Sequence, residues 1–353
     1  MRLRIAVDLR PLLEDFESGV KVYTKRMLVE MCKLPDLEIL PFYQSGRRSE
    51  IIHELFPLTV HIPLSNTKFH LQSVFVFPDL PSNYFERRPD LIWIPDRRPF
   101  YKTNIPVVFT IHDFVPELYP RTLSFKSRIW HSIFSYNRLK KIASGILTPS
   151  LSTASGLGIS APPFEVTYEG AVLAKVMREP TSVKKIASRP FFLTIAPADP
   201  RKGLKKIFAL AEFFPNVNFV IAGYKKTDGR FSFMPNRHKL KNLIILDEIS
   251  DGEKLWLLKH AAGLLALSLY EGFDLPALEA VKAKCPVILS DIAVHRELYK
   301  SNSFVKSHAD LICAVKKCLM GYGEVPALRG DYNWESAAKR ALLFFVRIVG
   351  NKN

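Results

Sequence analysis

A repeated alternation of short apolar runs with stretches of helical periodicity constrains the fold of this chain more than any other feature. The runs consist mainly of Val, Ile, Leu and Phe, without the polar alternation of a strand that has one face in water. Such strands are typical of parallel sheets whose two faces are both covered by helices. The runs occupy residues 3–7, 91–94, 107–111, 146–148, 191–195, 218–222, 243–246, 264–268 and 286–290.

Helical spacing of apolar residues falls between these runs. It predicts helices over residues 22–34, 125–143, 204–213, 252–262, 276–284 and 334–349. The alternation breaks in the polar residues 177–189 around Pro180, which we interpret as a linker. Because a chain of 353 residues exceeds the size at which single cores stop growing, the two series predict two doubly wound α/β domains.

The chain is strongly basic, with a formal charge of +16 that lies mainly in its second half. An excess of this size indicates an anionic partner: a nucleic acid, a membrane surface or a phosphorylated small molecule. The basic residues are scattered or paired, without the interleaved aromatics of an RNA-binding strand and without a helix-turn-helix frame. We therefore expect no specific nucleic-acid binding.

The sequence also carries expectations about the compartment. No apolar run approaches the roughly 18 residues of a membrane span, and Asp8 ends the first run too early for a signal-peptide core. The cysteines lack the spacing of a zinc site, so we expect no bound zinc, reduced thiols and a cytoplasmic protein. They are Cys32, Cys285, Cys313 and Cys318.

Candidate site residues follow the strands, because open α/β sheets bind ligands outside the carboxyl ends of their strands. The first run leads to Gly19 ahead of a helix, where a glycine either lets backbone amides approach an anion or only serves a turn. His112 and Asp113 follow the run at 107–111. There they could hydrogen-bond a sugar hydroxyl or move a proton, or they could serve as a structural cap.

Two later loops carry paired charges. Arg201 and Lys202 lie between a strand and a helix, where two cations suit a phosphate but also form an ordinary surface pair. Glu271 and Glu279 flank a glycine turn, and Pro276 begins a helix. Glu279 either caps that helix or accepts two hydrogen bonds from a vicinal diol such as ribose.

Residues 268–291, SLYEGFDLPALEAVKAKCPVILSD, resemble the nucleotide-recognition segment of family 4 retaining glycosyltransferases. The Glu-x7-Glu motif of that family runs here from Glu271 to Glu279. Four further stretches resemble family segments and occur in the family's order. They are DLRPL at 8–12 followed by Gly19 and Tyr23, TIHDF at 110–114, DPRKGL at 199–204, and Trp334-Glu335 with Ala337-Ala338.

The resemblance implies the GT-B fold, in which two Rossmann-like doubly wound domains face a cleft and the C-terminal helix returns to the first domain. The acceptor-side domain would cover 1–176 and 333–353, and the donor-side domain 190–332. The implied reaction moves a sugar from a UDP-, GDP- or ADP-sugar to a glycan or lipid-linked acceptor, with retention of configuration and without a metal or cofactor. It would belong to the synthesis of a surface polysaccharide or lipopolysaccharide.

The resemblance also implies roles for individual residues. Glu271, His112 and Asp113 would form the catalytic group that meets the donor sugar, and Glu279 would bind the ribose hydroxyls. Two cations would neutralise the pyrophosphate, which the backbone around Gly19 would approach. These cations are Lys202 and, as a weaker second, Arg201. The loop beside the donor consists of Gly272, Phe273, Asp274 and Leu275.

Three positions depart from the family pattern: Asp274 and Lys284 replace glycines, and Pro197 replaces an arginine that some members use for phosphate. A carboxylate at 274 would repel a diphosphate and weaken donor binding, unless it turns outward to serve the helix N-terminus or meets a sugar hydroxyl. Two alternatives therefore stay open. One is a catalytically degenerate GT-B scaffold protein, and the other is a nucleotide-sugar epimerase of the same fold.

The positive charge exceeds what one diphosphate site needs. We expect the remainder to attract the protein to an anionic cytoplasmic membrane leaflet, where a lipid-linked acceptor would lie. The sequence thus favours a cytoplasmic protein with a peripheral membrane preference.

Overall fold

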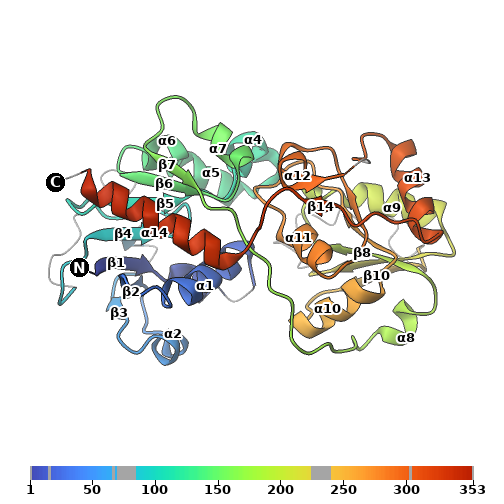
Figure 1. The fold of residues 1–353 in the computed structure, drawn as a ribbon, viewed down its shortest axis with the longest axis horizontal. Coiled ribbons are helices and arrows are strands. Elements are labelled where there is room, and N and C mark those ends of the chain that lie inside the picture. Colours follow the sequence, from blue (N-terminus) through green and yellow to red (C-terminus); the bar gives the residue numbers. More distant parts are fainter. Residues whose placement is uncertain are drawn as a thin grey trace. The chain divides into compact units, whose positions relative to one another are not determined.

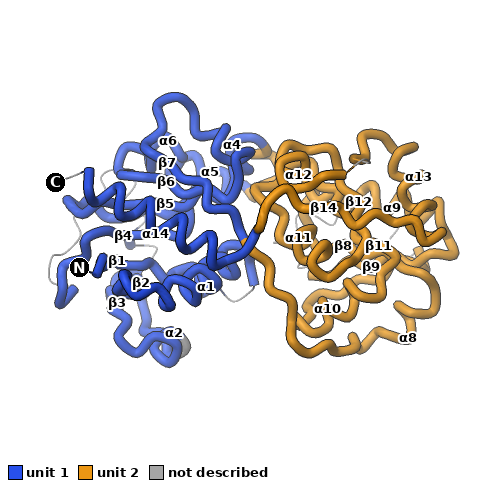
Figure 2. Tube along the Cα trace, viewed as in Figure 1, with its two compact units in different colours: residues 1–118, 125–169, 332–353 blue, residues 119–124, 170–331 orange. Residues whose placement is uncertain are grey.

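The computed structural model describes residues 2–14, 17–65, 68–69, 85–223, 240–301 and 304–351. The chain divides into two compact units (Figure 2). Unit 1 consists of residues 1–118, 125–169 and 332–353, and unit 2 of residues 119–124 and 170–331. The segment expected as a linker, 177–189, groups with unit 2 and contains the short helix α8 (Val183–Ile186).

Within the described residues, unit 1 is built on a seven-stranded parallel sheet in the order β3-β2-β1-β4-β5-β6-β7 (Figure 1). The strand order reverses between β1 and β4, which is the topological switch point where such sheets bind ligands. The strands are β1 Leu3–Asp8, β2 Leu37–Gln44, β3 Val60–Ile62, β4 Leu91–Ile94, β5 Val107–Thr110, β6 Gly145–Thr148 and β7 Phe164–Val166.

The last helix of the chain, α14 (Trp334–Gly350), belongs to unit 1 and packs with α1 (Gly19–Met31) (Figure 1). The ring of Trp334 lies 5.9 Å from that of Tyr23. Gly145 of β6 lets α14 lie close to that strand, because an added Cβ there would lie 2.7 Å from Phe344. The expected return of the C-terminal helix is confirmed. The other helices of unit 1 are η1 Arg10–Leu13, α2 Glu50–Leu55, α4 Val115–Leu118, α5 Phe125–Ile133, α6 Tyr136–Leu139, α7 Leu151–Ala154 and η3 Ser155–Leu157.

Two predictions for unit 1 need correction. The helix expected over 125–143 is two helices, because Ser135 adopts an extended backbone and starts α6 anew. The strands β2, β3 and β7 were not predicted. The sequence of β2, LEILPFYQ, contains Glu38 and Pro41, so it lacks the continuous apolar run that would predict a strand.

Unit 2 has a five-stranded parallel sheet in the described residues, in the order β10-β9-β8-β11-β12. Its switch point lies between β8 (Phe191–Ile195) and β11 (Gly263–Ala266). The other strands are β9 Asn218–Ala222, β10 Leu243–Leu246, β12 Val287–Leu289 and the antiparallel pair β13 Tyr299–Lys300 and β14 Ala327–Leu328. Besides α8, the helices in the described residues of unit 2 are η2 Pro120–Thr122, η4 Pro200–Lys202, α9 Leu204–Phe213, α10 Asp251–His260, α11 Leu275–Lys282, α12 Ala293–Leu298 and α13 His308–Leu319.

Apolar strands and helix faces close the core of unit 2 around Phe192, Leu210, Phe219, Ile288 and Val315, all nearly fully buried. This arrangement confirms the doubly wound α/β architecture expected from the continuous apolar runs. None of the helices in the described ranges is long and apolar enough to cross a membrane.

Candidate functional site

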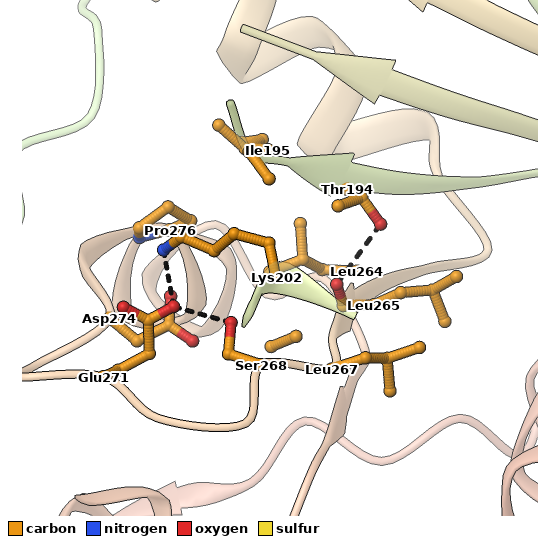
Figure 3. Close-up of a pocket in the computed structure, with 12 residues that line it drawn as sticks. Thr194, Ile195, Lys202, Leu264, Leu265, Leu267, Ser268, Glu271, Asp274 and Pro276 are labelled. Atoms are coloured by element: carbon orange, nitrogen blue, oxygen red, sulfur yellow. Dashed lines mark hydrogen bonds and ion pairs between the residues drawn. The ribbon is translucent and has the colours of Figure 1, made fainter. Parts of the chain in front are cut away.

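The clearest candidate site lies at the switch point of unit 2 (Figure 3). The loop after β8 and the loop after β11 meet there and enclose a pocket between apolar walls and a few polar side chains. Its lining comprises Thr194, Ile195, Ala196, Lys202, Leu264, Leu265, Ala266, Leu267, Ser268, Glu271, Asp274 and Pro276. The pocket therefore occupies the place where a parallel sheet of this order presents its ligand site.

Lys202 and Glu271 form the polar centre of the pocket (Figure 3). The Lys202 Nζ donates to Glu271 Oε1 at 2.5 Å, and the Ser268 hydroxyl donates to the same oxygen at 2.6 Å. Burial by itself would lower the pKa of Lys202, but the carboxylates of Glu271 and Asp274 raise it above its usual value. Lys202 is therefore a full cation at neutral pH, held in place by a carboxylate.

Gly203, the residue after Lys202, lets the loop after β8 approach the loop after β11 closely. Gly203 has a φ of 70°, and a Cβ there would lie 2.3 Å from the Leu267 carbonyl oxygen. The Leu269 amide donates to the Arg201 carbonyl at 2.8 Å and joins the two loops. The Arg201 side chain turns to Asp199 instead of the pocket, at 2.5 Å.

Asp274 lies at the start of α11 in the left-handed region, with a φ of 72°. Its Oδ1 is 3.4 Å from the Ala277 amide, which it caps, and its Oδ2 is 2.9 Å from His295 Nε2. The side chain of His295 is fully buried. Asp274 thus turns to the helix N-terminus, as one of the expected outcomes required, but it does so inside the protein.

Glu279 lies on α11 and pairs with Lys254 of α10. The Lys254 Nζ donates to Glu279 Oε1 at 2.7 Å and lies 3.2 Å from Asp251. Burial would lower the pKa of Lys254, but Glu279 and Asp251 raise it. Lys254 therefore orients the carboxylate of Glu279, for which the resemblance implies binding of the ribose hydroxyls.

In unit 1, His112 follows β5 and has both ring nitrogens near protein oxygens. Nε2 is 2.8 Å from the Pro95 carbonyl and Nδ1 is 3.6 Å from Glu169. Burial would lower the pKa of His112, but the hydrogen bond and charge of Glu169 raise it above its usual value. The edge of the Tyr23 ring packs on the imidazole at a centroid distance of 4.6 Å. These contacts orient His112, and its raised pKa makes it easier to protonate than an ordinary histidine.

The contacts of Asp113 and Gly19, the two other predicted site residues of unit 1, are local. Asp113 Oδ1 accepts from the Val115 amide at 2.8 Å at the start of α4. Gly19 begins α1, where an added Cβ would meet no atom within 4 Å, so packing does not demand a glycine. Their expected catalytic and donor-binding roles stay predictions.

The carboxyl edge of the unit 1 sheet also holds a network of buried charges. Asp8 ends β1, and its Oδ2 accepts from Arg10 Nε at 2.7 Å. Arg98 binds Asp96, which follows β4, and Glu14. Burial raises the pKa of Asp96 although Arg98 lies beside it. These charges are bound to one another and reinforce the loops after β1 and β4.

Of the residues predicted for the site, the pocket brings together Lys202, Glu271 and Asp274. The other predicted residues of unit 2 lie outside its lining: Arg201, Gly272, Phe273, Leu275 and Glu279. Phe273 is buried, so its side chain packs within the protein. Gly19, His112 and Asp113 lie in unit 1.

Sequence reasoning gave no role to Ser268, Lys254, His295 or Glu169. Ser268 stands at the end of a predicted strand beside Glu271, which is a signal that could have found it. The other three act across 21 to 57 residues of chain, so no local pattern identifies them. In the described part of the chain, no group of three or more His, Cys, Asp or Glu side chains is placed to hold a metal ion.

Two doubly wound units, with the last helix returned to the first, define the GT-B fold. A solved sucrose-phosphate synthase from Thermosynechococcus elongatus has the same arrangement, with a TM-score of 0.70 over 99% of this chain and all of that one. The identity is 14%, so this likeness concerns the fold alone.

Residues 178–319, which contain the whole pocket lining, match the family of glycosyl transferases group 1. The resemblance to glycosyltransferases of the GT-B fold is thereby confirmed, while membership of family 4 stays a prediction.

Curated relatives agree with this assignment. The serotype-specific mannosyltransferase WbdA of Escherichia coli is 30% identical over 160 residues, which cover 42% of this chain and 20% of WbdA. The O-antigen chain mannosyltransferase RfbU of Salmonella typhimurium is 26% identical over 195 residues, covering 54% of this chain and 53% of RfbU. The chain thus matches about a fifth of one relative and about half of the other.

Proposed function

We propose that this protein is a retaining glycosyltransferase that transfers a sugar from a nucleoside-diphosphate sugar to a glycan or lipid-linked acceptor in surface polysaccharide synthesis. The observation that carries the proposal is the pocket at the switch point of unit 2. There Lys202, Ser268 and Glu271 converge beside α11 in the segment that matches group 1 glycosyl transferases. The matches to transferases support transfer over epimerisation.

The pocket suits a nucleotide sugar in the order of its groups. Lys202 is a cation that can move from Glu271 to a diphosphate oxygen, which leaves Glu271 free to accept hydrogen bonds from the donor sugar. Glu279, one helix turn along α11, is held by Lys254 on Oε1 and would accept from the ribose hydroxyls. Mannose is the first sugar to test, because both curated relatives are named as mannosyltransferases.

In the proposed reaction the bond between the anomeric carbon and the diphosphate oxygen breaks, and the electron pair leaves with the nucleoside diphosphate. The acceptor oxygen forms its bond to the same carbon on the same face, and its proton passes to the leaving phosphate oxygen. Lys202 and the N-terminus of α11 stabilise the developing negative charge, so the reaction is proposed to need no metal. His112 and Asp113 are proposed to contact the donor sugar.

The acceptor side of the proposal rests on charge. A net charge of +16 exceeds what the diphosphate needs and supports a peripheral attraction to an anionic membrane surface that holds a lipid-linked acceptor. Binding to vesicles that rises with their anionic lipid content would agree with this. Equal binding at every composition would contradict it.

Calorimetry with UDP, GDP and ADP tests the donor site. We expect one of them to bind the wild type, and Glu279→Ala to weaken that binding about 100-fold, because two hydrogen bonds to a carboxylate are lost. Glu212→Ala, an exposed carboxylate of α9, is the matched control and should change nothing. Transfer is then measured with the corresponding nucleotide sugars, mannose first. A wild type that binds none of the three nucleotides would refute the proposal.

A further inference from the structure

The position of Asp274 poses a problem for an anion site, because its carboxylate lines the same pocket as Lys202 and Glu271. Counting these three side chains alone, the pocket would carry one net negative charge. A nucleoside diphosphate is itself an anion and would be repelled. Some group must therefore compensate Asp274 if the pocket binds such a ligand.

His295, on α12, is the group in contact with that carboxylate. Its Nε2 is 2.9 Å from Asp274 Oδ2, and its ring is fully buried. On the other side of the ring, Nδ1 lies 2.9 Å from the Ser290 carbonyl oxygen and 3.4 Å from the Ser290 hydroxyl oxygen. That hydroxyl donates its own proton to the Ser268 carbonyl at 2.6 Å. Every oxygen around Nδ1 is thus an acceptor, and Nδ1 must carry a proton.

The proton count of the pair follows from this. With Nδ1 protonated, either Nε2 is protonated too and faces a carboxylate, or Nε2 is bare and accepts from a protonated Asp274. Both arrangements have zero net charge. Burial would raise the pKa of Asp274, but the hydrogen bond and charge of His295, with Lys202, lower it.

The pair also fixes the backbone that shapes the pocket. Asp274 has a φ of 72°, a conformation that glycine adopts freely and that Asp tolerates better than most residues. Its Oδ1 caps α11 while its Oδ2 is held by His295, so one side chain joins the turn, α11 and α12. The N-terminus of α11 keeps its position next to Lys202.

We propose that His295 is a positioning residue of the donor site, which shares a proton with Asp274 so that this carboxylate adds no net charge to the pocket and holds the turn before α11. The proposal rests on the proposed function for its ligand, a nucleoside diphosphate. His295 touches neither donor nor acceptor in this role. It acts through Asp274.

The test is a cycle of three variants. His295→Gln keeps an N–H donor for Asp274 but removes the ring that shares the proton, so that an ionised Asp274 is left uncompensated. Asp274→Asn keeps a capping oxygen at a residue type that also tolerates a positive φ. The double variant Asp274→Asn with His295→Gln restores zero net charge without an ionisable group. All are measured at pH 8 for affinity towards the nucleotide that binds the wild type and towards inorganic pyrophosphate.

We expect His295→Gln to bind both ligands about 10- to 100-fold more weakly, the effect of one uncompensated charge a few ångströms away. The double variant should recover affinity to within a few-fold of the wild type. Urea unfolding shows whether each variant folds. If His295 were only structural, the double variant would bind as weakly as His295→Gln or more weakly, and that result would overturn the proposal, as would unchanged affinity in His295→Gln.

A second measurement does not depend on any ligand. Nitrogen-15 NMR of the histidine rings, with His295 assigned from the His295→Gln spectrum, should show Nδ1 protonated from pH 6 to 8. A bare Nδ1 would overturn the proton count. If the wild type binds no nucleotide while Nδ1 is protonated, the proposed function fails and the neutral pair stands.

Discussion

The two units carry charged residues at the same edge of similar sheets, but they use them differently. At the carboxyl edge of the unit 1 sheet, Asp8 and Arg10 are bound to each other and nearly fully buried. In unit 2, Lys202 and Glu271 pair at the wall of a pocket and stay partly exposed. A charged side chain that binds a ligand must be reachable by the ligand and must be able to exchange its partner. A charged pair that holds loops together is stronger when it is buried.

The contrast distinguishes ion pairs that stabilise the fold from ion pairs that can bind a ligand. A buried ion pair whose partners are both in the chain rigidifies a loop, and breaking it leaves a costly unpaired charge. A pair at a pocket can exchange its partner for a ligand at little cost, because water and the ligand reach both groups. Four experiments test the roles of these charges and of strained backbone positions in the two units.

The largest effect should come from Arg10→Met in unit 1. It leaves the buried Asp8 carboxylate without its ion-pair partner and should lower the free energy of unfolding by about 3–5 kcal/mol. Region-resolved hydrogen exchange would show the loss in β1 and its neighbours, with nucleotide affinity in unit 2 unchanged. Adding Asp8→Asn to this variant removes the stranded charge and should recover part of the stability.

The matched variant in unit 2 is Lys202→Met. We expect a loss of only about 1 kcal/mol, because Glu271 keeps its bond from Ser268 next to an open pocket, together with the loss of nucleotide binding. Equal destabilisation by Arg10→Met and Lys202→Met would contradict the contrast between the units.

A smaller effect concerns pH and the pair of His112 with Glu169. Because the pKa of His112 is raised in the folded protein, the stabilisation is complete below about pH 6.5, the usual histidine value, and is lost as pH rises through the folded pKa. Glu169→Gln should therefore cost about 1 kcal/mol more at pH 6 than at pH 9 in urea unfolding. Glu165→Gln, whose carboxylate pairs with Arg347, should cost the same at both values.

The smallest effect should be a gain from Lys284→Gly in unit 2. Lys284 is exposed and has a φ of 60°, so a glycine relieves the strain and should add about 0.5–1 kcal/mol to the free energy of unfolding. Tyr168→Gly in unit 1, at a φ of 59°, should destabilise instead, because its ring packs on Tyr332 at 5.3 Å and under Arg340. A gain in both variants would show that the ring contacts contribute little.

Much of unit 2 could be predicted from the sequence. The strands at 191–195, 218–222 and 243–246 and the helix at 204–213 have the predicted bounds, because continuous apolar runs and amphipathic spacing are local signals. Unit 1 was harder to predict. Its strand β2 contains charged and proline residues, and its expected helix at 125–143 is divided at Ser135.

The positions that depart from the family pattern show the limit of sequence reasoning most clearly. Asp274 and Lys284 stand where the resemblance led us to expect glycine. The structure gives both residues a positive φ, a conformation that glycine adopts freely. At position 274 a histidine 21 residues away holds the side chain.

The sequence by itself determined the two doubly wound domains, the loops that carry the site, and the residues Lys202, Glu271 and Asp274 that meet in one pocket. The domains and loops follow from periodicity and strand position, and Asp274 was identified through the resemblance to a glycosyltransferase family; all of these are properties of short segments. Only the tertiary structure decided the partners: Glu271 for Lys202, Lys254 for Glu279, Glu169 for His112 and His295 for Asp274. Which side chains pair depends on the packing of segments that are distant in the sequence. This pairing decides which of these charged side chains a ligand would contact.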